Sequence, residues 1–255
     1  EFLSEENFKD AFAVISKGLD IAEKENDKDL IGFGNFYLGN YFAKQKSYSR
    51  AVIYYNNSLN VFTQLNNEVE IANSFFNIGK MYQYTFEFEK ALFNFFKSLK
   101  IAEKRNDEKQ IADNLTKIGE VYLLTPDLKK AQINFNKAIE IYTKINKEKE
   151  IIGNLINLGA SYQKQGNITK AIEIFKRGLV KAINANLKIS ESILLGNIGS
   201  SSRRIKKYDT SLEYLFKALS LKLKLKRYAS AAHTCNDISE TYIEIGNLVK
   251  AKEYA

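Results

Sequence analysis

The feature that most constrains this chain is a glycine that returns every 40 residues. The glycines with this spacing are Gly39, Gly79, Gly119, Gly159 and Gly199, and a serine, Ser239, takes the sixth place. A second small residue follows twelve positions later, and its copies are Ala11, Ala51, Ala91, Ala131, Ala171, Ser211 and Ala251. Self-similarity at such a period is typical of repeat architectures, in which each unit covers the apolar face of its neighbour.

This register runs without insertion or deletion from Ala11 to Ala251, so it predicts one array that occupies residues 1–255. The expected units are a partial repeat at 1–27, five full repeats at 28–67, 68–107, 108–147, 148–187 and 188–227, and an incomplete repeat at 228–255. Because the chain begins without methionine and ends inside an expected helix, we expect a fragment of a longer protein.

Each unit is predicted to form two helices. In residues 68–106, apolar residues fall at helical spacing twice, first at Ile71, Phe75, Ile78 and Tyr82, and then at Phe88, Ala91, Leu92, Phe95 and Leu99. A break at residues 84–87 separates the two runs, and the equivalent breaks contain turn-forming residues such as Pro126 and Gly166. The pattern therefore predicts an all-α array of helix pairs.

The second break of each unit carries an asparagine at the same 40-residue spacing. Its copies are Asn26, Asn66, Asn106, Asn146 and Asn186. Asparagine tolerates the left-handed conformation that commonly ends a helix, so we expect these residues to be helix stops. The recurring glycine costs about 1 kcal/mol relative to alanine within a helix. It therefore indicates a close approach between helices, with the alanine of the second helix as its expected neighbour.

Composition limits the chemistry that the chain can support. Apolar residues make up 45% of the chain and charged residues 27%, which suits a folded protein with a core. The single cysteine, Cys235, excludes an internal disulfide and fits a reducing compartment. The single histidine, His233, excludes a multi-histidine metal site, and the sequence has no glycine-rich phosphate loop. We expect no enzymatic activity, no cofactor and no metal.

The net charge of +8 favours three classes of partner: acidic proteins, nucleic acid and anionic membranes. The charges are spread along the chain, and the lysine and asparagine content also fits the composition of an AT-rich genome. Direct nucleic-acid binding is disfavoured, because stacking needs exposed aromatic residues and the repeat places most of them in the core. We favour a cytoplasmic location, with the periplasm as the alternative if upstream sequence carries a signal.

The repeated motif resembles the tetratricopeptide repeat (TPR). The match is carried by Asn77, Gly79 and Tyr82 followed by Lys90, Ala91 and Phe95, and again by Asn157, Gly159, Tyr162, Lys170, Ala171 and Phe175. This chain departs from the family in its period of 40 rather than about 34, and in lacking the usual tryptophan and closing proline. The longer variety is similar to the TPR arrays of bacterial peptide-sensing regulators, kinesin light chains and sensor regions of histidine kinases.

The resemblance implies a right-handed superhelical α-solenoid of antiparallel helix pairs, whose first helices line the concave face. It implies a protein- or peptide-binding scaffold or sensor in bacterial signal transduction or transcription regulation. The alternative is a self-association module that forms a homo-oligomer, and no small-molecule substrate is expected. The concave-face candidates are first-helix residues near the glycines: Asn40, Asn77, Lys80, Lys117, Glu120, Asn157, Lys164, Asn197, Arg203 and Asn236.

Two hypotheses concern these candidates. Asn77, Asn157 and Asn197 could form a ladder along a peptide backbone, because an amide side chain both donates and accepts; the alternative is that they bond to neighbouring repeats. The basic candidates, from Lys80 to Arg203, predict an acidic ligand segment, and the alternative is an ordinary solvated face. Repeat five departs most from the pattern, with Gly196 and Ser202 in place of larger residues, which predicts a hinge or pocket or reflects drift.

Overall fold

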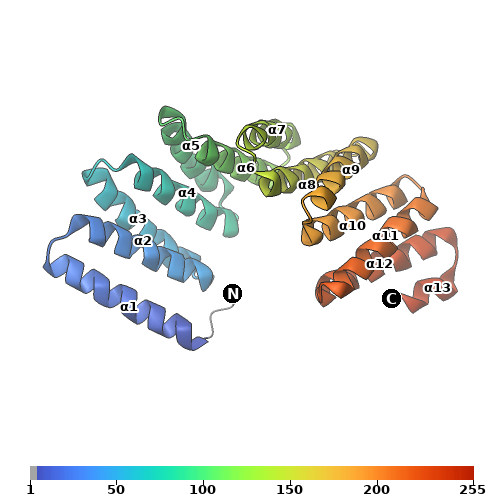
Figure 1. Cartoon of the computed structure of the whole chain (residues 1–255), viewed down its shortest axis with the longest axis horizontal. Helices are drawn as coiled ribbons and strands as arrows, with labels where there is room; N and C mark the ends of the chain where they lie inside the picture. The colour runs from blue at the N-terminus through green and yellow to red at the C-terminus, as the bar shows by residue number, and fades with distance from the viewer. Residues whose placement is uncertain (1–4) are drawn as a thin grey trace. The chain divides into compact units, whose positions relative to one another are not determined.

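The computed structural model describes residues 5–255, with side chains from Asp10 onward, so the first residues of the expected partial repeat lie outside the described part. Within the described part every regular element is an α-helix, which confirms the all-α prediction. In chain order (Figure 1), the helices are α1 (Glu5–Lys24), α2 (Lys28–Lys44), α3 (Tyr48–Gln64), α4 (Glu68–Tyr84), α5 (Phe88–Lys104), α6 (Glu108–Leu124), α7 (Leu128–Lys144), α8 (Glu148–Lys164), α9 (Ile168–Asn184), α10 (Lys188–Arg204), α11 (Tyr208–Lys224), α12 (Tyr228–Ile245) and α13 (Leu248–Glu253).

The chain divides into two compact units, Glu1–Val121 and Tyr122–Ala255. Within each unit consecutive helices pack as antiparallel pairs, such as α2 with α3 in the first unit and α10 with α11 in the second. We call the even-numbered helices the first helices of their repeats and the odd-numbered ones the second helices. This arrangement is that of a TPR-type α-solenoid, as predicted. The assignment of all repeats to a single domain, with the boundaries given above, stays a prediction.

The helices end where the repeated turn residues predict. Every helix from α2 to α11 has 17 residues, and three-residue turns separate them. The middle residue of most turns is left-handed, and the asparagines have φ values of 54° (Asn26 and Asn66), 53° (Asn106), 56° (Asn146) and 52° (Asn186). Asparagine adopts this region more readily than most residues, so the prediction of asparagine helix stops is confirmed. Elsewhere bulkier residues take the same conformation, among them Phe86 with a φ of 61°.

The recurring glycines approach a side chain other than the one expected. A Cβ atom added to Gly159 would lie 2.3 Å from Cε1 of Phe175, and one added to Gly79 would lie 2.8 Å from the Phe95 ring. The backbone oxygen of Ala91 is more distant, at 3.2 Å from the same Gly79 position. The neighbour of the glycine is therefore the large residue four positions after the alanine. A flat ring can lie directly on a helix backbone only where no Cβ intervenes.

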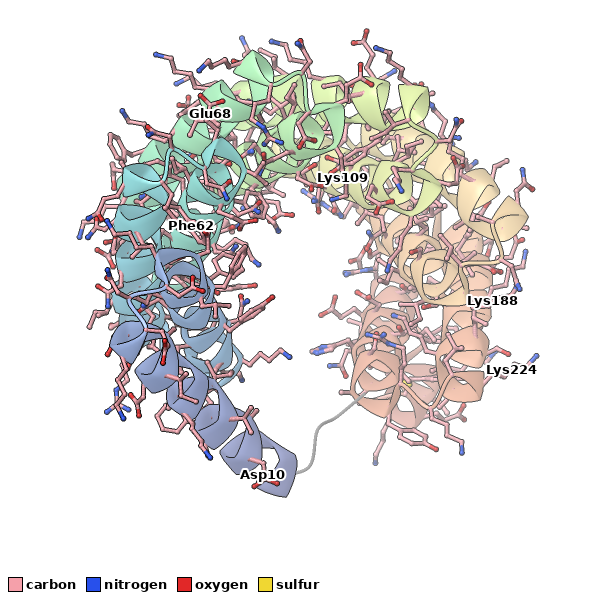
Figure 2. The ribbon with its side chains drawn as sticks, turned by 60° about the vertical axis from the view of Figure 1, so that its left-hand side comes forward. Asp10, Phe62, Glu68, Lys109, Lys188 and Lys224 are labelled. Atoms are coloured by element: carbon pink, nitrogen blue, oxygen red, sulfur yellow. The ribbon has the colours of Figure 1, made fainter. Side chains whose placement is uncertain are left out.

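Each unit has its own apolar core beneath the first helices. In the first unit Phe42, Tyr55 and Met81 belong to one buried cluster, and Phe62 of α3 is also fully buried (Figure 2). In the second unit Phe175 and Ile198 belong to the corresponding cluster. These cores fix the first helices in place, so that their remaining faces are presented to solvent. None of the helices in the described part is long and apolar enough to cross a membrane.

Repeat five has a charged residue in its core. Lys222 is only 7% exposed, and it stands where the earlier second helices have Phe62, Ala102, Tyr142 and Ala182. Its Nζ atom donates to Oγ1 of Thr234 at 2.7 Å and lies 3.5 Å from the position of a Cβ on Gly196. The missing side chain at Gly196 therefore leaves space that the ammonium group occupies. Whether this repeat acts as a hinge stays a prediction.

Candidate functional site

The first helices of the first unit border a hollow of about 560 Å³. Residues from four helices line it: Ala11 and Ile15 of α1; Tyr37, Asn40, Tyr41, Ala43 and Lys44 of α2; Tyr55 of α3; and Lys80, Met81 and Tyr84 of α4. The α2 residues at 37, 40, 41 and 44 share one helix face because their spacing follows the helical period. The lining combines aromatic rings with two lysines and contains no carboxylate.

Asn40 is held by the repeat that it belongs to. Its Oδ1 atom accepts a hydrogen bond of 2.8 Å from the hydroxyl of Tyr55, whose side chain is fully buried. Burial also raises the pKa of the Tyr55 hydroxyl, so that it remains a donor at all ordinary pH values. The amide nitrogen of Asn40 has no partner among the described side chains. One end of the amide is therefore fixed, and the other can donate to a ligand.

Asn77 is engaged at both ends of its amide. Its Nδ2 atom donates to the backbone oxygen of Asn73 at 2.9 Å, one turn earlier in α4. Its Oδ1 atom accepts from Nζ of Lys80 at 3.3 Å. A peptide backbone would have to compete with both bonds. Neither bond reaches a neighbouring repeat, which was the alternative to the ladder.

Lys80 lies where positive charge is poorly compensated. Its ammonium is 5.8 Å from the centroid of the Phe76 ring. Burial lowers the pKa of Lys80, the nearby ammonium of Lys117 lowers it further, and Glu120 opposes both effects. Glu120 is mainly committed elsewhere, because it pairs with Lys117 at 2.8 Å and accepts from Gln83 at 3.2 Å. An added negative charge beside Lys80 would therefore be favourable.

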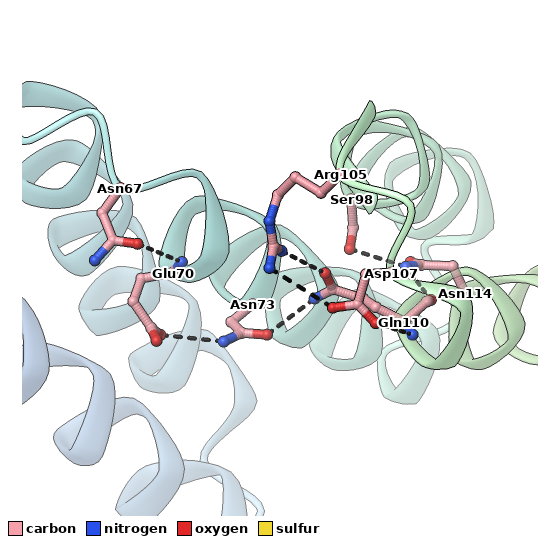
Figure 3. A network of polar contacts seen from close by, with 8 residues as sticks. All are labelled: Asn67, Glu70, Asn73, Ser98, Arg105, Asp107, Gln110 and Asn114. Carbon is pink, nitrogen blue, oxygen red and sulfur yellow. Dashed lines mark hydrogen bonds and ion pairs between the residues drawn. The ribbon is translucent and has the colours of Figure 1, made fainter. Parts of the chain in front are cut away.

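A chain of polar contacts joins α4 to α6 next to this region (Figure 3). Oδ1 of Asn73 accepts from Nε2 of Gln110 at 2.9 Å, while Nδ2 of Asn73 donates to Glu70 at 3.2 Å. Gln110 also accepts from Arg105, and its backbone N–H donates to Asp107, which caps α6. With each amide bonded to the next, these residues fix one first helix against another and contribute rigidity to the site.

In the second unit two of the ladder residues are free of internal partners. Asn157 of α8 and Asn197 of α10 stand at equivalent places on contacting first helices, and both are half-buried. Neither side chain forms a hydrogen bond within the described residues. Asn236 of α12 is exposed and likewise unbonded there. The two half-buried amides are the ones most available to a backbone, but the ladder itself stays a prediction.

The basic candidates of the second unit already form hydrogen bonds or ion pairs within the chain. Lys164 donates to the backbone oxygen of Leu123 at 2.9 Å, near the end of α6. Arg203 contacts three carboxylates of α12: Glu240 at 2.5 Å, Glu244 at 2.9 Å and Asp237 at 3.6 Å. Burial raises the pKa of Asp237 even though Arg203 opposes that effect. These three carboxylates of the last repeat therefore pair with Arg203 instead of leaving it free for a ligand.

Sequence reasoning missed the aromatic part of the site and the pairing across repeats. Tyr41 and Tyr84 are not at repeat-defining positions, so the periodicity gave no reason to group them with Tyr37, which stands two places before Gly39 at the position of Asn77. The structure shows a regular spacing for this pairing. Polar contacts between neighbouring first helices occur at separations near one repeat, 37 residues for Gln83 with Glu120 and 41 for Arg203 with Glu244. Within the described residues no group of His, Cys, Asp and Glu could hold a metal ion.

Comparison with known families gives an assignment at the level of the fold. The sequence profile of the family described as soluble NSF attachment protein (SNAP) matches residues 38–191, which is more than half of the chain. The chain belongs to this family. It is a family of α-helical repeat proteins, in agreement with the helix pairs described above. A search among curated proteins finds no match.

Several solved structures share the fold. The apo form of RapI is 24% identical with a TM-score of 0.74, and the match covers 97% of this chain and 88% of that one. The apo quorum sensor NprR from B. thuringiensis is 16% identical with a TM-score of 0.69, covering 98% and 74%. A Rap protein complexed with competence and sporulation factor is 15% identical with a TM-score of 0.62, covering 88% and 73%. These structures confirm the TPR resemblance.

Proposed function

We propose that this chain is a protein- or peptide-binding sensor or scaffold module of bacterial signalling or transcription regulation, and that its ligand lies along the first helices. The observation that carries the proposal is the hollow of about 560 Å³ between α2 and α4. Two relatives by fold support it, since one is a quorum sensor and the other is a Rap protein complexed with competence and sporulation factor. Ligand sites are commonly concave and apolar with a few polar groups, as this hollow is.

The chemistry of the hollow favours a ligand segment with both an aromatic or aliphatic side chain and a carboxylate. Tyr37 and Tyr84 offer half-exposed rings, and rings of this kind anchor partners effectively. Lys44 and Lys80 supply the positive charge, and no carboxylate of the lining offsets it. Of the four basic residues expected to contact an acidic ligand, Lys117, Lys164 and Arg203 are bonded internally. The proposed contacts are therefore Lys80 and Lys44, which lines the same hollow.

The test uses a displayed library of random peptides. Peptides are selected on the wild-type chain, and their affinities are measured by fluorescence polarisation for the wild type, for the double variant Lys44→Glu/Lys80→Glu and for Lys100→Glu. Lys100 is an exposed residue of the second helix α5 and serves as the control. We expect acidic peptides to be enriched, and their affinity to fall about tenfold or more in the double variant but not in the control. Equal affinity for all three proteins would refute the proposal.

A further inference from the structure

The second helices of the second unit carry a separate groove, which we call the outer groove. It has a volume of about 830 Å³ and lies between α9 and α11, with the start of α10 between them. Ile183, Leu195, Phe216 and Leu221 supply apolar lining. Three lysines, Lys188, Lys217 and Lys224, and one carboxylate, Glu191, border it. Figure 2 labels Lys188 and Lys224 on the same flank of this unit. The groove involves none of the first-helix candidates described above.

Two of the apolar residues that line the outer groove are partly exposed. Ile183 is 48% exposed and Phe216 is 36% exposed. Leu223, which stands at the place of Ile183 one repeat later and does not line the groove, is 48% exposed. The other repeats provide an internal comparison, because at the place of Ile183 and Leu223 they have Thr63, Glu103 and Thr143. Polar residues are thus sufficient for the fold at this position. Clustered exposed apolar side chains rimmed by charge are typical of protein interaction surfaces.

The charges at the rim depart from the repeat in the same direction. In repeat two Glu68, at the start of the first helix, pairs with Lys104, at the end of the second. The equivalent residues in repeat five are Lys188 and Lys224, which are both basic. Lys188 pairs with Glu191 at 2.9 Å, whereas Lys224 has no partner among the described residues. A pair of opposite charges has been replaced by two basic residues, and only Lys188 has an acidic partner. A negative group of a ligand would therefore be favourable beside Lys224.

We propose that the outer groove binds an acidic amphipathic helix of a partner protein. An amphipathic helix places apolar residues at i, i+3, i+4 and i+7 on one face, which suits a groove between two helices. An acidic residue on its flank would meet Lys224, the unpaired lysine of the rim, since Lys217 pairs with Glu213 at 2.5 Å and Lys188 with Glu191. A second copy of this chain is a poor occupant, because the chain carries a net charge of +8. An anionic membrane is also a poor fit, since the apolar side chains line a recess and a bilayer surface cannot enter it.

The experiment uses two labelled model helices of about 18 residues, long enough to span the groove. Both have leucine on one face, and the remaining face carries glutamate in one peptide and lysine in the other. Binding to the whole chain is measured by fluorescence anisotropy. We expect saturable binding of one glutamate peptide per chain, about tenfold or more tighter than that of the lysine peptide. No saturable binding of the glutamate peptide would overturn the proposal.

Variants locate the site. Ile183→Ser and Lys224→Glu should each weaken the glutamate peptide about tenfold. Ile133→Ser and Lys137→Glu are matched controls, because both residues are exposed on the second helix α7 and neither lines the groove. Equal losses in test and control variants would overturn the proposal. The same would follow if phosphatidylserine vesicles or a DNA duplex bound more tightly than the peptide with the same dependence on Ile183 and Lys224, since the surface would then belong to a membrane or a nucleic acid.

Discussion

Two glycines of α8 allow the packing role of the repeat to be tested within a single helix. Gly159 belongs to the 40-residue series, and a Cβ there would lie 2.3 Å from Cε1 of the fully buried Phe175. Gly153 lies in the same helix, is exposed, and would have nothing within 4 Å of its added Cβ. Replacing each glycine with alanine therefore makes the same chemical change in two opposite environments.

The magnitudes follow from two terms. Alanine improves helix propensity by about 1 kcal/mol at either site. At Gly153 nothing opposes that gain, so Gly153→Ala should stabilise the chain by about 1 kcal/mol. At Gly159 carbon atoms that prefer a separation of about 3.5–4.0 Å would be forced together, so we take the upper end of the overpacking cost, about 3 kcal/mol. The expected net loss for Gly159→Ala is about 2 kcal/mol, which separates the two variants by about 3 kcal/mol.

The assay is urea unfolding followed by circular dichroism, with the midpoints and slopes of both variants compared with the wild type. A third protein, Gly159→Ala/Phe175→Ala, isolates the contact. Phe175→Ala alone should be strongly destabilising, but in that background Gly159→Ala should cost little, because the opposing ring is absent. The reasoning is refuted if Gly159→Ala is as stable as the wild type, or if its cost is unchanged when Phe175 is removed.

Two further predictions concern residues that depart from the repeat. Lys222→Met should stabilise the chain by about 1–3 kcal/mol at pH 7, because the ammonium is buried with hydroxyl and carbonyl partners only. Burial lowers the pKa of Lys222, so the folded chain holds this proton less tightly than the unfolded chain. The free energy of unfolding of the wild type should therefore rise as pH rises from the lowered pKa towards the unfolded value of about 10.4. In Lys222→Met this rise should be absent, as measured by thermal unfolding at several pH values. Phe86 is 73% exposed and left-handed. Its replacement by asparagine should raise the free energy of unfolding by about 1 kcal/mol in the same urea assay, whereas replacement by alanine should not.

The helices and turns could be predicted from the sequence because their determinants are local. Apolar spacing sets the helix faces, and Asn66 or Asn106 ends a helix through its own backbone preference. The repeat then multiplies each local signal, so that a single ambiguous residue does not matter. Pro126 is a useful exception, since proline cannot adopt positive φ and the turn that contains it does without the left-handed residue.

The packing partners could not be predicted in the same way, because they depend on how helices are offset in space. The sequence presented Ala91 and Phe95 as equally regular neighbours of Gly79, and smallness suggested the alanine. An aromatic ring can pack against the backbone of a glycine as closely as a small residue can. The structure shows that Phe95 packs against Gly79 in this way. The same reason hid the contacts of Arg203. A helix register of 41 residues between repeats cannot be read from residue types alone.

Departures from the repeat differ in whether a second change balances them. The buried Asn114 of repeat three donates to Ser98 of repeat two at 3.0 Å. Two repeats later the equivalent residues are Leu194 and Gly178, which lie against each other. There the larger residue is matched by the smaller one, so the interior remains filled and without an unpaired polar group. Such compensated changes need only a structural explanation.

The charges behave differently. In repeat five Lys224 has lost the acidic partner that Lys104 has in Glu68, because Lys188 stands in its place and pairs with Glu191. Lys44 and Lys80 border a hollow that has no carboxylate. An uncompensated charge raises the energy of the isolated chain, and a bound partner of opposite sign can lower it. We therefore assign binding to the places where the repeat is unbalanced in charge, and packing to the places where it is balanced in volume. On that criterion we expect Arg203, which is paired with three carboxylates of α12, to have a structural role although it lies on a first helix.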